Sequence, residues 1–162
     1  MHNPKRGKID RKNVFDETDL AILRILQENP KSRIKDLADK LGIPKSTVHY
    51  RIKKLEDLGV IKGYNAILDS EKLGFEYLVV ILIRGKYGPK YHEEIGRFLS
   101  NSPYIQAVYF VLGDVDFVVI GKFPNKEKYM EFLESLINSR FIERSSTMVV
   151  AKVIKESFKL NI

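Results

Sequence analysis

The spacing of Ala38, Gly42 and Val48 restricts the fold of the first third of the chain more than any other feature. A helix-turn-helix requires a small residue where its two helices cross, a glycine where the turn is left-handed, and a buried aliphatic residue in the second helix. These three residues meet the three requirements in order. The spacing therefore predicts one short helix within SRIKDLADKLG (residues 32–42) and a second helix that begins near Pro44.

A further helix is predicted ahead of this pair, within FDETDLAILRILQENP (residues 15–30). Asp16 is suited to accept hydrogen bonds from the first-turn amides, and Pro30 closes the segment. Ser32 is predicted to cap the following helix in the same way. Both helices carry apolar residues at helical spacing, so each should bury one face. These residues are Leu20, Ile22, Leu23, Ile25 and Leu26 in the first helix, and Ile34, Leu37, Ala38 and Leu41 in the second.

The helix that begins near Pro44 has two different faces. At about 100° per residue, Val48, Ile52 and Leu55 lie within a narrow arc and are predicted to pack against the other helices. Arg51 falls near the apolar edge, where packing or an ion pair is as reasonable a role as contact with a ligand. The other face carries hydroxyl, imidazole, phenol and ammonium groups. Its residues are Ser46, Tyr50 and Lys53, with Thr47, His49 and Lys54 beside them.

Positive charge is concentrated in this part of the chain. Residues 1–62 hold 15 Lys and Arg against 9 Asp and Glu, whereas residues 63–162 hold 13 against 12. Such an asymmetry indicates a basic module that meets a polyanion, joined to a module with another role. In a helix-turn-helix the second helix enters the major groove of double-stranded DNA. Lys45, Lys53 and Lys54 are then expected near phosphates, and Ser46, Thr47, His49 and Tyr50 near base edges; the alternative is a three-helix packing unit with a solvated basic face.

The rest of the chain alternates between strand and helix patterns. After a strand predicted over IKGYNAIL (residues 61–68), the order is strand, helix, strand, strand, helix, strand. This βαββαβ order is the ferredoxin-like arrangement, so the whole chain is predicted to be an α+β protein. Asn125 is expected to cap the second of the two helices. The predicted ranges are 77–85, 89–99, 105–113, 116–123, 125–137 and 146–154.

The predicted strands are apolar on both faces, as in YLVVILI (residues 77–83) and FVVI (residues 117–120). A lone ferredoxin-like sheet has helices on one face only, and its strands should alternate between apolar and polar residues. The chain has no further helices with which to cover the second face. A second copy of the same domain is the simplest cover, which predicts a two-fold homodimer.

The segment GDVD (residues 113–116) is a polar interruption between two apolar strands. It is interpreted either as a hairpin turn or as a small-molecule site, in which amides bind a carboxylate and an aspartate binds an ammonium group. Asp114 and Asp116 have no third ligand for a metal, and no motif indicates a catalytic residue or a cofactor.

Cysteine is absent, and neither a secretory signal nor a membrane-spanning run is found; the expectation is a cytoplasmic protein that is not an enzyme.

Three segments, DETDLAILRILQEN, LADKLGIPKSTVHYRIKKLEDLGVIKGYNAILDSEKLG and LGDVDFVV, resemble the Lrp/AsnC (leucine-responsive/asparagine, feast/famine) family of transcription regulators. The resemblance covers nearly everything from Phe15 onward. It implies a winged-helix-like DNA-binding domain and a dimerising domain that binds an amino acid or similar metabolite, with four dimers often forming an octamer. By matching position, it implies an effector site at Gly113, Asp114, Val115 and Asp116, with Thr147 on the last strand.

The chain departs from the family pattern at three places. Val115 stands where the family usually has Tyr, which leaves the ligand open. Pro44 stands where a Ser often caps the recognition helix, so Ser46 or Thr47 is expected to take over part of that role. The basic segment of residues 1–14 precedes the usual family start, either as an arm that contacts DNA or as a solvated tail.

These observations divide the chain into a basic extension (1–14), a helix-turn-helix domain (15–61), a strand and linker (62–75), and a ferredoxin-like domain that binds an effector and dimerises (76–162). The favoured function is sequence-specific DNA binding that a small effector modulates. One alternative is an architectural DNA-coating protein with little sequence choice. The other is a metabolite-sensing ferredoxin-like protein whose helices bind another protein.

Overall fold

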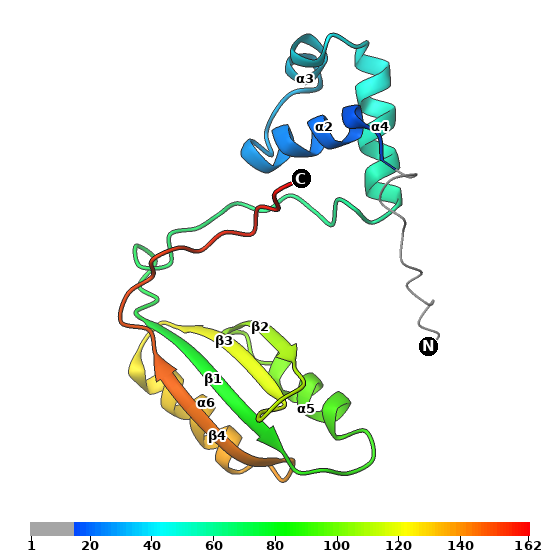
Figure 1. Ribbon diagram of the computed structural model, residues 1–162. Coiled ribbons are helices and arrows are strands. Elements are labelled where there is room, and N and C mark those ends of the chain that lie inside the picture. The colour runs from blue at the N-terminus through cyan, green and yellow to red at the C-terminus, as the bar shows by residue number, and fades with distance from the viewer. Residues whose placement is uncertain (1–14) are drawn as a thin grey trace. The chain divides into compact units, whose positions relative to one another are not determined.

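A computed structural model describes residues 15–162, so the basic segment 1–14 lies outside the described residues. The described chain divides into two compact units (Figure 1). The helical unit comprises residues 15–67 together with 157–162, and the sheet unit comprises residues 68–156. This division falls inside the predicted junction at 62–75. Among the described residues, no helix has both the length and the apolar character needed to cross a membrane.

The helical unit contains α2 (Glu17–Glu28), α3 (Ile34–Leu41) and α4 (Lys45–Asp57), which confirms the predicted helix-turn-helix. Asp16 caps α2, where it and Asp19 form a reciprocal capping box. The predicted Ser32 cap is wrong, because Arg33 occupies the N-cap position of α3 and no side chain caps that helix. The buried core consists of Ile22, Leu26, Leu37, Ala38, Val48 and Leu55.

Gly42 makes the turn between α3 and α4 possible. Its φ of +66° lies in the left-handed region, where a side chain would be strained. The amide of the next residue, Ile43, donates to the carbonyl oxygen of Ala38 at 3.2 Å and closes the turn. Ala38 and Val48 are both buried, as the spacing predicts.

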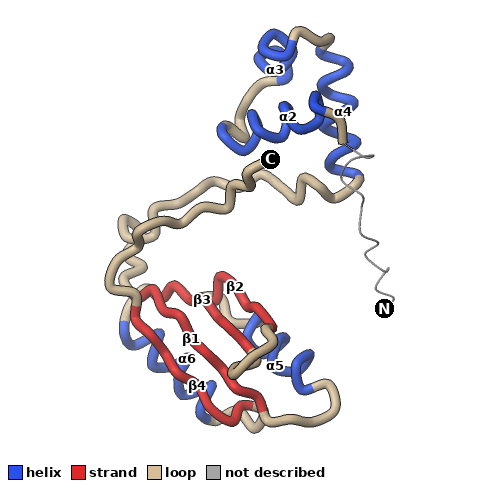
Figure 2. Tube along the Cα trace, in the orientation of Figure 1, coloured by secondary structure: helices blue, strands red, loops and turns tan. Residues whose placement is uncertain are grey.

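The sheet unit follows the predicted βαββαβ order. Its four strands are arranged as β2-β3-β1-β4, and every neighbouring pair is antiparallel, as in a ferredoxin-like sheet. Figure 2 shows the two helices of this unit on one side of the sheet. The elements are β1 (Tyr77–Gly85), α5 (Tyr91–Ser100), β2 (Ile105–Phe110), β3 (Phe117–Phe123), α6 (Lys126–Ile137) and β4 (Ile142–Val149).

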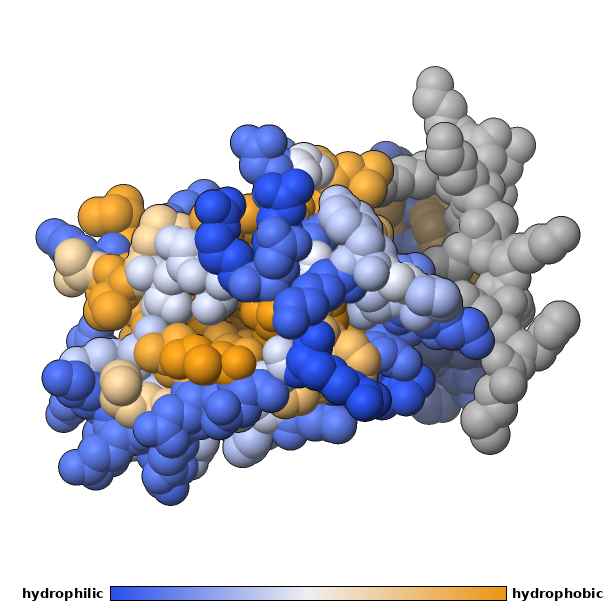
Figure 3. Space-filling view, turned by 90° about the horizontal axis from the view of Figure 1, so that it is seen from below, coloured by the Kyte–Doolittle hydropathy of each residue, from blue (hydrophilic) through white to orange (hydrophobic). Residues whose placement is uncertain are grey.

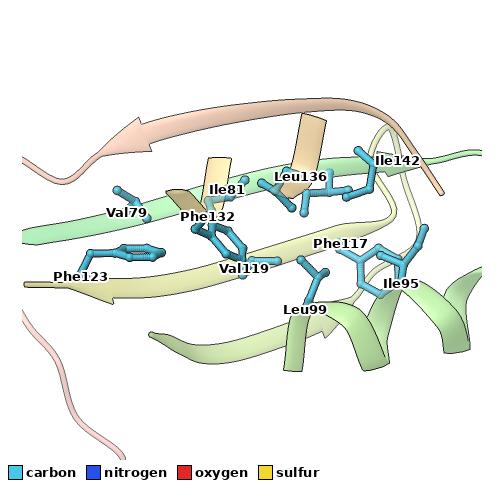
Figure 4. Close-up of a cluster of buried hydrophobic side chains, with 11 residues drawn as sticks. Val79, Ile81, Ile95, Leu99, Phe117, Val119, Phe123, Phe132, Leu136 and Ile142 are labelled. Atoms are coloured by element: carbon cyan, nitrogen blue, oxygen red, sulfur yellow. The ribbon is translucent and has the colours of Figure 1, made fainter. Parts of the chain in front are cut away.

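Alternate residues of β1 and β3 form the core of the sheet unit. Burial along both strands follows the period of two that a half-covered strand requires. The inward side chains meet those of α5 and α6, and burying each one contributes about 1.5–3 kcal/mol. Figure 4 shows this cluster, which includes Val79, Ile81, Phe117, Val119 and Phe123 from the strands and Ile95, Leu99, Phe132 and Leu136 from the helices.

The opposite face of the sheet is also apolar, as predicted from the strands. Its central residues are only partly buried by their neighbours, and Tyr109 and Met148 at its margins are exposed. Figure 3 shows apolar side chains reaching the surface in patches between hydrophilic ones. The central residues of this open sheet face are Val80, Leu82, Val118 and Ile120, which β1 and β3 bring together by register.

Two predicted strands differ from the observed structure. The strand expected over residues 61–68 is wrong, because Lys62–Leu68 are exposed and form no backbone ladder with any described residue. An apolar pattern forms a strand only where a second backbone is available for pairing. The last strand starts earlier than predicted and ends at Val149, since its polar beginning pairs with β1 up to a bulge between Arg84 and Gly85.

The segment Ser157–Ile162 returns to the helical unit and contacts α2. The side chain of Gln27 donates to the carbonyl of Leu160 at 3.1 Å and accepts from its amide at 2.6 Å. Lys159 and Glu28 form an ion pair at 2.7 Å. The sequence offers no local signal for this contact, because its two partners lie about 130 residues apart.

Candidate nucleic-acid interface and effector loop

One face of α4 presents the residues predicted to meet DNA. Tyr50 is the largest of them and is 70% exposed. The buried residues of α4 are Val48 and Leu55, which lie on the other face and fix the helix to its unit. Lys45, Ser46, His49 and Lys53 are also exposed, whereas Thr47 and Lys54 are half-buried.

The N-terminus of α4 is favourable for an anion. No side chain caps the helix, so the expectation that Ser46 or Thr47 would do so is wrong. The first turn contains no acidic residue, and it contains Lys45. The first-turn amides and the helix dipole therefore act together with the lysine on any phosphate that approaches.

Arg51 belongs to an ion-pair network inside the helical unit. Its Nη1 lies 2.7 Å from Oδ2 of Asp16 and 2.8 Å from Oδ1 of Asp19, which is 1% exposed. The backbone amide of Asp19 and the guanidinium of Arg51 both lower the pKa of Asp16, the amide having the larger effect. Lys54 approaches Asp19 at 3.7 Å. Arg51 is thus paired with two carboxylates at the start of α2, and of the roles considered for this residue (packing, an ion pair or contact with DNA) the structure shows the ion pair.

The predicted effector loop is a tight connection between β2 and β3. The amide of Val111 donates to the carbonyl of Asp116 at 2.8 Å, which closes the loop. Gly113 and Asp114 are exposed at its tip, and Val115 is half-buried. The loop therefore offers backbone amides and one exposed carboxylate to solvent.

Asp116 differs from the rest of the loop because it is buried, with 6% exposed. Its Oδ2 accepts from the amide of Gly85 at 2.8 Å, and its Oδ1 accepts from the hydroxyl of Tyr91 at 3.2 Å. Its own amide donates to the carbonyl of Ile83 at 2.9 Å. Asp116 thus joins the loop to the end of β1 and to the start of α5.

Thr147 lies apart from the loop within one chain. Thr147 lies on β4 and pairs with Ile81 of β1, and β1 separates β4 from β3. Two strand spacings of about 4.8 Å, together with the offset along the strands, place it more than about 10 Å from the loop. The structure therefore brings Gly113–Asp116 together and leaves Thr147 outside that group.

Two family models match the chain, one to each half. The winged helix-turn-helix DNA-binding model matches residues 15–62, and the Lrp/AsnC ligand binding domain model matches residues 78–160. The chain belongs to the Lrp/AsnC family of transcription regulators. The first model covers α2, α3 and α4, and the second covers all the strands and helices of the sheet unit except the first residue of β1.

Relatives and solved structures agree with this assignment. The transcriptional regulator FL11 of Pyrococcus horikoshii is 39% identical over 148 residues, covering 91% of this chain and 97% of its own. The leucine-responsive regulatory protein of Haemophilus influenzae is 31% identical over 157 residues, covering 94% of this chain and 93% of its own. An AsnC family regulator from Agrobacterium tumefaciens has a TM-score of 0.84 at 30% identity, covering 91% of this chain and 97% of that one.

A more distant structure shows the same fold. The transcriptional regulator of Neisseria meningitidis solved as its L-Met complex has a TM-score of 0.85 at 23% identity, covering 91% of this chain and 96% of that one.

Three residues of this Lrp/AsnC chain have roles that the sequence did not reveal. Asp19 reads as a first-turn residue that suits the helix dipole, yet it also anchors α4. The sequence places Gly85 at the end of a predicted strand and Tyr91 within a predicted helix. In the structure both residues donate a hydrogen bond to the carboxylate of Asp116. The only signal in the sequence is an aspartate at the end of a polar turn, and this signal does not identify the partners of Asp116.

Proposed function

We propose that the chain regulates transcription by binding a specific DNA sequence through α4. The exposed face of α4, with Lys53 beside Tyr50, is the single observation that carries this proposal. Because Arg51 is paired internally, the phosphate contacts come from Lys45 and Lys53, with Lys54 shared between Asp19 and DNA. Ser46, Thr47, His49 and Tyr50 reach the base edges and set the sequence preference.

The regulator acts as a homodimer in the cytoplasm. Two copies pack through the open sheet face, which removes Val80, Leu82, Val118 and Ile120 from water. Two recognition helices then read half-sites about 34 Å or a multiple apart on DNA. Four such dimers assemble into an octamer.

The effector is an amino acid bound near Gly113–Asp116. Backbone amides of the loop bind its carboxylate, and the exposed Asp114 binds its ammonium group. A distantly related protein of the same fold is solved with L-Met, which supports this class of ligand. Thr147 lies too far from the loop to share a ligand with it within one chain. This separation fits a site to which a second copy of the chain contributes. Effector binding shifts the arrangement of the dimers and thereby the affinity for DNA.

DNA recognition is tested by selecting a preferred site from a random pool and measuring affinity for that site and for scrambled DNA at several salt concentrations. Lys53→Ala should weaken both by a similar factor and reduce the salt slope by about one. Tyr50→Ala should change which sequence is selected. Equal binding of selected and scrambled DNA at every salt concentration would favour the architectural, DNA-coating alternative.

The effector proposal is tested by light scattering of the full chain during titration with each of the twenty amino acids. At least one of them should change the mass of the assembly, and Asp114→Asn should abolish that response. No change with any amino acid would refute an amino-acid effector acting on assembly, while DNA recognition would stand on its own test.

A further inference from the structure

Asp116 has little capacity left for a ligand. Gly85 and Tyr91 each donate to one of its oxygens, at 2.8 Å and 3.2 Å, and the side chain is buried. A carboxylate taken out of water in this way requires such donors, since leaving it unpaired costs several kcal/mol. By contrast, Asp114 lies two residues earlier, is exposed, and accepts no hydrogen bond from another described residue.

The two donors are themselves held in place. Gly85 lies where the pairing of β1 with β4 shifts, and a Cβ there would lie 2.5 Å from Cδ1 of Ile95 and 2.9 Å from Cδ2 of Tyr91. Only glycine therefore allows the Tyr91 ring to pack this close to the strand. Figure 4 shows Ile95 next to Phe117 in the buried cluster of the sheet unit.

Tyr91 is positioned by the backbone that precedes it. It is the first residue of α5 and follows Lys90, whose φ of +58° is the only left-handed φ of a residue other than glycine among the described residues. Burial, and then the hydrogen bond to Asp116, raise the pKa of Tyr91, so the phenol is protonated and donates at neutral pH.

We propose that Gly85 and Tyr91 are positioning residues for the effector loop, and that Asp116 serves as their anchor and not as a direct ligand of the effector. We call these three residues the Asp116 latch. The latch holds Asp116 at the base of the loop, which fixes the backbone amides of Gly113–Val115 in the geometry that a carboxylate requires. This inference rests on the proposed function, because it assigns separate roles within the proposed effector loop.

Tyr91→Phe tests the latch because it removes a single hydroxyl. Tyr87→Phe is the matched control, since the Tyr87 ring contacts that of Tyr91 but its hydroxyl makes no hydrogen bond with a described residue. Hydrogen exchange of the full chain without ligand should show about tenfold faster exchange at Gly85, Val111 and Asp116 in Tyr91→Phe. The control should exchange at the wild-type rate.

The second readout is titration with L-methionine, or with whichever of the twenty amino acids changes the light scattering of the wild type. Tyr91→Phe should raise the midpoint about three- to tenfold and keep the same final assembly. Asp114→Asn should abolish the response without accelerating exchange. Wild-type exchange in Tyr91→Phe, or faster exchange with an unchanged midpoint, would overturn the latch. If no amino acid acts on the wild type, the effector proposal fails, and the exchange rates alone decide the latch.

Discussion

Replacing Arg51 with alanine is expected to destabilise the helical unit more than removal of any other cation from α4. Arg51 is the main partner of Asp19, which is 1% exposed and cannot recover hydration in the folded unit. Lys54 is left as the nearest cation to Asp19, at 3.7 Å. The variant therefore keeps a buried carboxylate and loses its best donor.

The size of the effect follows from this geometry. Removing one partner of a fully buried ion pair costs about 3–5 kcal/mol. The Arg51 side chain is 24% exposed and Lys54 remains, so water and the lysine recover part of that energy. We expect a loss of about 2–3 kcal/mol in the free energy of unfolding, or roughly 10–20 °C in Tm for a unit of this size.

Urea titration of the full chain, followed by far-UV circular dichroism, measures this loss. Lys53→Ala is the control, because Lys53 lies on the same helix, is exposed and makes no ion pair with a described residue. Calorimetry separates the two units if they unfold in different transitions. If the free energies of unfolding of Arg51→Ala and Lys53→Ala agree within about 0.5 kcal/mol, the network does not hold α4, and the reasoning is refuted.

The pH dependence provides an independent check. The pKa of Asp16 is lowered from 3.8 in the folded unit by the Asp19 amide and by Arg51. A lowered folded-state pKa contributes stability that is present above the unfolded value and is lost as the pH falls below about 3.8. Arg51→Ala removes the second of these two causes, so its stability should decrease less steeply between pH 5 and pH 3 than that of the wild type.

Three further variants test other features. Gly42→Ala should cost about 1 kcal/mol or more in urea titration, because its φ is +66°; an unchanged midpoint would contradict a strained left-handed turn. Ile120→Glu places a carboxylate on the open sheet face and should yield monomers in light scattering, whereas Gln106→Glu on β2 should not. Deletion of residues 157–162 should lower the stability of the helical unit by about 1 kcal/mol or less, because the ion pair it removes is exposed; a greater loss would show that the segment is part of the core.

Features that depend on local periodicity could be predicted from the sequence. The two faces of α4 follow from the 3.6-residue repeat, so the buried Val48 and the exposed Tyr50 were both anticipated. Arg51 was placed near the apolar edge by the same repeat, and the structure then supplied its partners. The βαββαβ order followed from the alternation of strand and helix patterns, and the observed β2-β3-β1-β4 arrangement agrees with it.

Features that depend on distant partners could not be predicted in the same way. Residues 61–68 have the composition of a strand, but strand formation requires a neighbouring backbone, and none of the described chain pairs with them. The resemblance to the family implies that Asp116 belongs to the effector site, but it does not indicate that the side chain is buried. Its burial depends on Gly85 and Tyr91, which lie 31 and 25 residues away in the sequence.

Asp19 and Asp116 are the two buried charged residues of the described chain, one in each unit. Burying a carboxylate opposes folding unless donors replace its water, so each must provide something that an apolar residue could not. Asp19 holds two cations of α4, and Asp116 holds the amide of Gly85 and the hydroxyl of Tyr91. An apolar residue could fill either space, but it could not orient donors on a second element. Directional bonds restrict α4 and the loop to one orientation each, and these are the elements proposed to meet DNA and the effector.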